Sequence, residues 1–161
     1  MMSKEDLIVQ YGLQVHPEGG FYKETYRSAE KISLGNGKVR NAGTAIFYML
    51  SDNDRSHFHK ISSDEMWFYH EGEPLNIFVL HADGSLVTER LGRNVLRGEK
   101  LQVVIPANVW FAASVEAFKG YCLVSCVVAP GFDFEDFVLA ERGALLTCFP
   151  QHAGIIKAYT I

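Results

Sequence analysis

The stretch Ser56–Gly72, SHFHKISSDEMWFYHEG, decides how this chain of 161 residues is interpreted. His57 and His59 are two residues apart, so both imidazoles lie on the same face if the segment is a strand. A polar break at 62–64 has the composition of a turn, and Glu65 opens a second apolar run. Two histidines and one carboxylate therefore converge from adjacent antiparallel strands. Such a set could bind a divalent metal ion with positions left open for water or substrate, or it could transfer protons.

Short apolar or alternating segments, separated by turn signals, continue on both sides of this stretch. They predict strands at 21–28, 43–50, 74–81, 86–91, 101–105, 109–114 and 121–128. Strands of similar length with regular turns indicate an antiparallel sandwich or barrel. The polar segment 30–41, which contains Gly35 and Gly37, is interpreted as a mobile loop.

Helices are predicted at both ends of the chain. Residues 3–11 form a helix that opens with a capping box and ends at Gly12. Apolar residues recur at helical spacing in 132–158, so short helices are expected there, outside the barrel. We therefore expect one domain over residues 1–161, with the barrel at about 21–129.

Composition and charge restrict the class of protein. Hydrophobic residues make up 48% of the chain, and 15 basic against 19 acidic residues give a net charge of −4. Without a basic cluster, a nucleic-acid surface is not expected. Apolar runs are too short to cross a bilayer, and the N-terminus lacks the apolar core of a signal peptide. Three cysteines without framework spacing fit a reducing compartment, so we expect a cytoplasmic protein with buried thiols.

The motif residues resemble a known family. His57-x-His59, Glu65 and Gly72 match the first conserved motif of the cupins, and the resemblance covers nearly the whole chain. Further stretches look like successive landmarks of one subgroup, at 16–22, 56–59, 64–67, 104–110 and 129–133. Members of this subgroup are small single-domain proteins of mostly unassigned function. The resemblance implies an all-β fold, a cupin-type antiparallel β-barrel or jelly roll with short flanking helices at both termini, and a homodimer.

The second cupin motif ends in a histidine that supplies the fourth metal ligand. Five residues after Pro106, this chain has Phe111 instead, and a phenyl ring cannot bind a metal. A metal ion would therefore be held by His57, His59 and Glu65 with waters, or with Gln102 as a further ligand. The candidate metals are nickel, iron and zinc, weakly bound or absent, and a metal-free pocket is the alternative.

Strand alternation also predicts a ligand cavity. Trp67 and Tyr69 share the face of Glu65, so they should point inward, and aromatic walls around a small polar cluster suit a flat or ring-shaped ligand. Ordinary core packing, with imidazoles that only hydrogen-bond to Glu65, is the alternative. The candidate ligand contacts are His57, Trp67, Gln102, Phe111, Tyr48, Glu18 and Tyr22.

The resemblance also suggests a reaction. Small cupins include deoxysugar-nucleotide epimerases, which are metal-free and use an interior histidine as a base. By this resemblance His59 would be the base, Glu65 would orient it, and Tyr69 or Tyr48 would supply the acid. The protein would then be an isomerase or epimerase acting on a sugar or another polar cyclic molecule. Two alternatives stay open: a metal-dependent, oxygenase-like enzyme that uses His57, His59 and Glu65, and a non-catalytic ligand-binding or sensing module.

Overall fold

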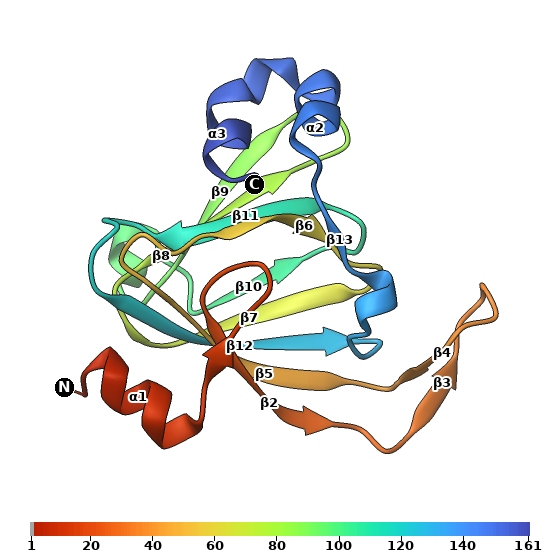
Figure 1. Cartoon of the computed structure of the whole chain (residues 1–161), viewed down its shortest axis with the longest axis horizontal. Coiled ribbons are helices and arrows are strands. Elements are labelled where there is room, and N and C mark those ends of the chain that lie inside the picture. Colours follow the sequence, from red (N-terminus) through yellow and green to blue (C-terminus); the bar gives the residue numbers. More distant parts are fainter. Residues whose placement is uncertain (1) are drawn as a thin grey trace.

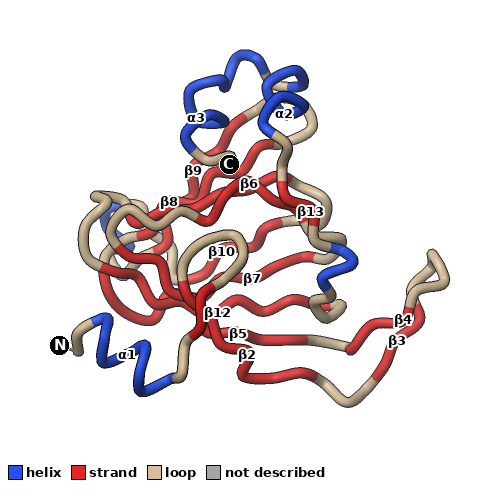
Figure 2. Tube along the Cα trace, viewed as in Figure 1, coloured by secondary structure: helices blue, strands red, loops and turns tan. Residues whose placement is uncertain are grey.

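The computed structural model describes residues 2–161 and contains two β-sheets that lie face to face (Figures 1 and 2). The first sheet has the spatial order β1 (Gln14–Val15), β2 (Phe21–Arg27), β5 (Thr44–Ser51), β12 (Tyr121–Ala129), β7 (Asp64–Gly72) and β10 (Gln102–Ile105). The second has the order β13 (Val138–Leu139), β6 (Ser56–Lys60), β11 (Trp110–Val115), β8 (Leu75–Leu80) and β9 (Leu86–Leu91). All pairs of neighbouring strands are antiparallel. The predicted antiparallel jelly roll is confirmed.

The main core lies between the two sheets. Tyr48 from the first sheet and Phe111 from the second are both 1% exposed, and Trp67 lies between them with its ring edge-on to each. Burying a large apolar side chain contributes about 1.5–3 kcal/mol, so these rings are a main source of stability. Trp67 and Phe111 fill their part of the space between the sheets, so the open cavity lies elsewhere, beside His59 and Glu65.

Short helices cover the outside of the sheets, as predicted. Helix α1 (Lys4–Tyr11) begins at the Ser3 capping box and buries Leu7 against the first sheet. Helices α2 (Arg142–Cys148) and α3 (Ala153–Ala158) cover the second sheet, where Phe58 is fully buried (Figure 1). Three short 3₁₀ turns complete the chain: η1 (Val95–Arg97), η2 (Phe134–Asp136) and η3 (Pro150–His152). No helix among residues 2–161 has the length and hydropathy needed to span a membrane.

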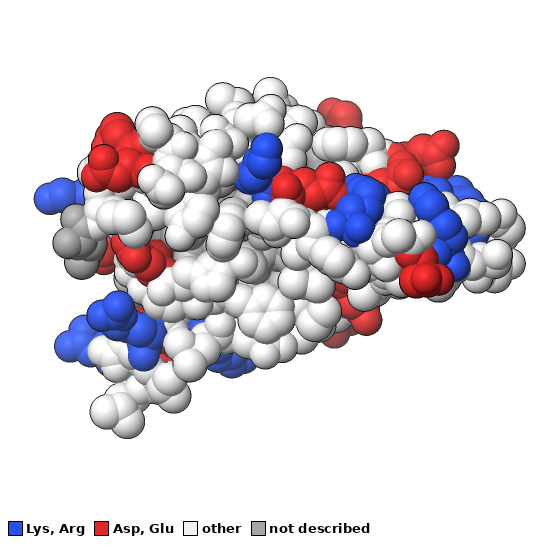
Figure 3. Space-filling model, turned by 90° about the horizontal axis from the view of Figure 1, so that it is seen from below, with Lys and Arg blue, Asp and Glu red and all other residues white. Residues whose placement is uncertain are grey.

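One local prediction is wrong. Instead of a mobile loop, segment 30–41 contains a two-stranded ladder, β3 (Lys31–Ser33) and β4 (Val39–Asn41), which projects from the body (Figure 2). Basic and acidic side chains are interspersed around this end of the molecule, whereas the middle of the same face carries few (Figure 3). The C-terminal region is mainly helical, as predicted, although the two-residue strand β13 interrupts it and pairs with β6.

Register shifts decide which side chains face the interior. In β6, Ser56 and His59 lie opposite Ala113 and Phe111 of β11, so β6 carries one extra residue between these pairs. A similar shift occurs in β2 between Glu24 and Tyr26. Each β-bulge reverses the alternation of the strand beyond it.

The predicted homodimer stays a prediction. Strand β10 is an edge strand, and native proteins normally cover or blunt such edges. Light scattering at micromolar concentration should therefore give about twice the mass of one chain, and the mass of a single chain would contradict the prediction.

Candidate functional site

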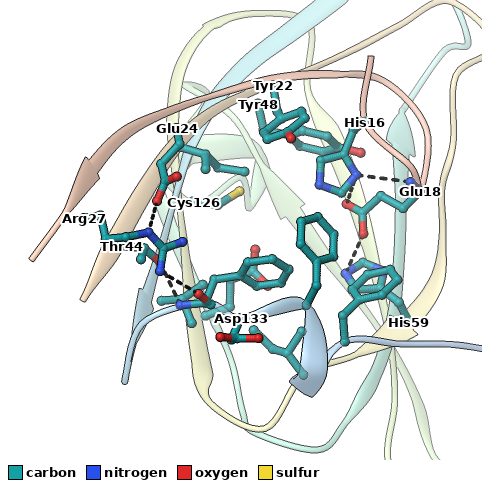
Figure 4. A pocket seen from close by; sticks show the side chains of 17 residues that line it. His16, Glu18, Tyr22, Glu24, Arg27, Thr44, Tyr48, His59, Cys126 and Asp133 are labelled. Carbon is teal, nitrogen blue, oxygen red and sulfur yellow. Dashed lines mark hydrogen bonds and ion pairs between the residues drawn. The ribbon is translucent and has the colours of Figure 1, made fainter. Parts of the chain in front are cut away.

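A cavity of about 340 Å³ opens between the two sheets (Figure 4). Five of its titratable side chains form a buried group: His16, Glu18, Tyr48, His59 and Glu65. Three charged side chains form an exposed group: Glu24, Arg27 and Asp133. The remaining wall is Tyr22, Thr44, Ile46, Ile61, Cys126, Val128, Phe132, Phe134 and Phe137. Its volume lies at the lower end of the range for ligand sites.

His59 and Glu18 form the closest contact of the buried group, with Nε2 of His59 3.1 Å from Oε2 of Glu18. On its other side, Nδ1 of His59 lies 2.7 Å from the carbonyl oxygen of His57. A carbonyl only accepts hydrogen bonds, so Nδ1 must carry a proton. Nε2 then either accepts a proton from a protonated Glu18 or donates one to its carboxylate. The two side chains therefore share one exchangeable proton.

Burial decides where that proton resides. It raises the pKa of Glu18 and lowers the pKa of His59, because taking either group out of water penalises its charged form. Both directions favour a neutral pair in which Glu18 donates to the imidazole. Burial, with a smaller contribution from the neighbouring Glu18, raises the pKa of Glu65 to about 7. Near neutral pH, the cavity therefore contains a carboxyl group that readily gains or loses a proton.

The loop between β1 and β2 positions Glu18. Its backbone closes on itself, because the N–H of His16 donates to the carbonyl of Gly20 at 2.9 Å. The carbonyl of Glu18 accepts from the N–H of His57, and the hydroxyl of Tyr48 donates to Gly19. The side chain of Glu18 also accepts from the hydroxyl of Ser56 at 3.1 Å. The loop is thus tied to both sheets and directs the carboxyl group into the cavity.

His16 has one tautomer fixed in the same way. The backbone N–H of Glu18 donates to Nδ1 of His16 at 3.1 Å, so the proton of the neutral ring is on Nε2. Figure 4 shows His16, Glu18 and His59 on one side of the cavity, with Glu24, Arg27 and Thr44 on the opposite side. A ligand between them would contact the titratable side chains His16, Glu18 and His59 at one end and the partly exposed wall at the other.

Five of the residues predicted from the sequence line this cavity: Glu18, Tyr22, Tyr48, His59 and Glu65. Alternation along β7 correctly placed Glu65 inside, and its predicted neighbour Trp67 is also buried. The partner of His59 differs from the prediction, because Glu18 rather than Glu65 contacts Nε2.

His57 does not line the cavity, contrary to the prediction from alternation. The bulge in β6 separates its side chain from that of His59, and Nδ1 of His57 faces the carbonyl of Glu18 at 2.8 Å. Ser56 takes the inward position instead and donates to Glu18. His57 therefore supports the loop and the tautomer of His59 rather than contacting a ligand in the cavity.

Four other predicted residues lie outside the cavity wall. Trp67 and Phe111 are buried in the core, where Phe111 packs on His59 with ring centroids 4.2 Å apart. The hydroxyl of Tyr69 donates to the carbonyl of Gly72, away from the residues that line the cavity. Gln102 is exposed on the edge strand β10.

Sequence reasoning missed most of the opposite wall. Arg27 faces inward because of the bulge in β2, which leaves Tyr26 58% exposed. Phe132, Phe134 and Phe137 were expected in or near helices that cover the barrel. The stretches that contain His16 and Phe132 were among the landmarks of the resemblance, which was the one signal available for them.

The predicted metal ligands do not fit a metal ion. Among residues 2–161, no three His, Cys, Asp or Glu side chains are arranged to hold one. His57 and His59 face different partners, and both ring nitrogens of His59 already have protein partners. Phe111, which the resemblance places at the position of the fourth ligand, lies opposite His59 in the register of β6 and β11. The donor set therefore does not support the metal-dependent alternative.

The 132–137 segment forms one side of the cavity and is held by two arginines. Nη1 of Arg27 donates to the carbonyl of Phe132 at 3.0 Å. Arg40, with its side chain 7% exposed, donates through Nε and Nη2 to both carboxylate oxygens of Asp136 and through Nη2 to Glu135. These bonds link the β3–β4 hairpin to the wall of the cavity.

Arg40→Met should loosen this wall. The substitution keeps most of the side-chain length but leaves the buried Asp136 without its bidentate partner. Hydrogen exchange of the amides in 132–137 should accelerate at least tenfold, while β5 and β12 keep their protection. Arg97→Met, in the exposed turn η1, is the matched control. Unchanged exchange in 132–137 would show that the ion pairs do not hold the segment.

Comparison with known proteins shows the family of the chain. Residues 5–140 match the family described as Cupin superfamily (DUF985). An uncharacterized protein of Saccharomyces cerevisiae is 35% identical over 148 residues, covering 83% of this chain and 73% of the yeast protein. A hypothetical protein from Leishmania major is 37% identical, with a TM-score of 0.94 and 99% of each chain covered.

Two further solved structures have a similar fold. A protein from Shewanella oneidensis is 35% identical, with a TM-score of 0.93, covering 100% of this chain and 99% of that one. A variant of Bacillus subtilis oxalate decarboxylase, 12% identical, has a TM-score of 0.58, with 90% of this chain and 36% of that one covered, and shows the shared fold alone. These matches give no support to the resemblance to deoxysugar-nucleotide epimerases. The match over 136 residues and the 35% identity to the yeast protein show that this chain belongs to the DUF985 family of the cupin superfamily.

Proposed function

We propose that the cavity binds a small ring-shaped molecule and moves a proton on it without a metal ion, as an isomerase or epimerase does. The observation that carries this proposal is the 3.1 Å contact between His59 and Glu18 in the cavity wall. Such a pair can pass its shared proton between the carboxyl group and the imidazole, and perturbed titratable groups in a cavity favour a catalytic role.

Each buried group has a task in this reaction. Glu65, with a pKa of about 7, would take a proton from the ligand or return one to it. The Glu18–His59 pair would supply the second proton-transfer partner, because proton transfer needs both an acid and a base near the reacting atoms. The carbonyl of His57 keeps Nδ1 of His59 protonated, so Nε2 is the nitrogen whose protonation changes. Tyr48 donates to Gly19 and positions the loop.

Proton transfer can be tested by isotope exchange. The protein is incubated in D₂O with a mixture of small hydroxyketones, aldoses, lactones and cyclic ketones, and mass spectrometry detects any compound that gains deuterium. Wild-type protein should accelerate exchange into at least one of them. His59→Gln should reduce this rate about 10²–10⁴-fold, because it keeps a polar side chain but removes the titratable ring. Because His59 is buried and packs on Phe111, the exchange rate of this variant is compared with wild type per folded molecule.

His81→Gln is the matched control, because His81 lies in the β8–β9 turn outside the cavity wall. It should exchange at the wild-type rate. Binding of a compound without any exchange would contradict the catalytic proposal and favour the second candidate, a non-catalytic binding module.

A further inference from the structure

The buried part of the cavity offers many hydrogen-bond acceptors and few donors. Glu18 and Glu65 provide carboxyl oxygens, and the shared proton of the Glu18–His59 pair is already used within the pair. The Nε2–H of His16 is a donor in this buried group, so the acceptor oxygens outnumber the donors. The hydroxyl of Tyr48 donates to Gly19, so it is not free to donate to a ligand. A buried acceptor that finds no donor destabilises a complex by the cost of its lost water. A ligand that fits here must therefore bring donors of its own.

The exposed part of the cavity also has more hydrogen-bond acceptors than free donors. Glu24 and Asp133 line it, and Arg27 is the one permanent cation among the described residues of the wall. Nε of Arg27 donates to Oε1 of Glu24 at 2.6 Å, and Nη1 donates to Asn41 and to the carbonyl of Phe132. Three of the five N–H groups of Arg27 are thereby used by the protein, which leaves Nη2.

This arrangement does not suit an anion. Proteins bind phosphate or carboxylate groups with two-pronged arginine contacts or with several free backbone N–H groups. Here the guanidinium already has a carboxylate partner, and the backbone N–H of Phe132 donates to the hydroxyl of Thr44 at 3.0 Å. The carboxylates of Glu24 and Asp133 at the exposed end would repel an added negative charge, and Glu65 would do so whenever it is ionised.

We infer that the ligand is a neutral or positively charged ring that carries several hydroxyl or amino groups and neither a phosphate nor a carboxylate. This inference rests on the proposed function, because it takes the cavity to be a small-molecule site. Its donors would face Glu18, Glu65 and Glu24, and its apolar ring faces would lie against phenyl groups of the 132–137 segment. Phe132 and Phe134 pack edge to face, with centroids 4.9 Å apart, at the exposed end of this wall. Phenyl faces accept C–H groups of a sugar ring or a cation, but not an anion.

Ring-matched probes test the charge preference directly. The first set is glucose, glucosamine, glucuronate and glucose 6-phosphate, and the second is cyclohexanol, cyclohexylamine and cyclohexanecarboxylate. Each is titrated into the wild-type protein while the backbone amide signals of the cavity are followed by NMR. In any set that binds, the neutral and amino members should bind at least tenfold more tightly than the anionic members.

Glu24→Gln sharpens the test. It removes a negative charge and gives Nε of Arg27 a weaker, neutral acceptor, so the preference for the amine over the carboxylate should narrow at least threefold. Glu5→Gln, on the exposed face of α1, makes the same chemical change away from the cavity and should leave the preference unaltered.

The outcomes separate this inference from the proposed function. Equal or tighter binding of the anionic members would overturn the inference while leaving the cavity a small-molecule site. If no member of either set shifts the cavity amides at millimolar concentration, both the inference and the proposed function are contradicted.

Discussion

Glu65→Gln is expected to stabilise the protein by about 3 kcal/mol at pH 8 and by only about 1 kcal/mol at pH 5. Burial raises the pKa of Glu65 from its ordinary value of 4.5 to about 7. Below pH 4.5 the carboxyl group is protonated in the folded and the unfolded chain, so it behaves like the neutral amide. Between pH 4.5 and 7 the unfolded chain releases the proton while the folded chain keeps it. Stability therefore falls as pH rises through this window, and the amide removes that loss.

Urea unfolding of both proteins between pH 5 and 8 measures this difference, with the slope of each transition as a check on two-state behaviour. Glu5→Gln on α1 controls for the loss of an exposed carboxylate and should show no comparable pH dependence. A constant difference between Glu65→Gln and wild type across the range would show that Glu65 does not titrate near neutrality. The same result would remove it as the proton-transfer group of the proposed function.

The sequence predicted the strands of this fold well because their alternation depends on local residue pattern. It also placed Glu65 and Trp67 inside, since β7 is regular from Asp64 to Phe68. The failures begin where a bulge adds a residue. His57 was predicted to face the cavity and Ser56 was not, yet one extra residue in β6 exchanges their roles.

A bulge leaves no periodic signal, because its cost and benefit lie in contacts with other strands. The bulge in β2 is the second case, since it turns Arg27 inward and Tyr26 outward. The helical spacing of Phe134 and Phe137 predicted helices that pack outside the barrel, but both rings line the cavity. Arg27 and Arg40 hold the 132–137 segment in this position. The site thus depends on long-range contacts that a single sequence does not reveal.

Gly19→Ala should destabilise the protein by roughly 3 kcal/mol or more and should also abolish the Glu18–His59 contact. Gly19 has φ +115°, and a Cβ atom there would overlap the backbone carbonyl of Arg55. The loop that contains Gly19 cannot shift easily, because the carbonyl of Glu18 accepts hydrogen bonds from His57 and the carbonyl of Gly19 accepts one from Tyr48. The loop must therefore move, and it carries Glu18 with it.

Alanine substitutions at two other glycines distinguish the effect of backbone strain on stability from the effect of moving Glu18. Gly35→Ala, in the turn of the β3–β4 hairpin, meets open space without a positive φ, so stability should stay within about 0.5 kcal/mol of wild type. Gly72→Ala shares the strain of Gly19→Ala, with φ +104° and an overlap with the carbonyl of Tyr121, but Gly72 lies outside the cavity wall. Urea unfolding should show a large loss for both strained variants, whereas deuterium exchange per folded molecule should be lost only in Gly19→Ala. If Gly72→Ala lost exchange equally, the effect would be general destabilisation, and the proposed role of the loop in positioning Glu18 would be wrong.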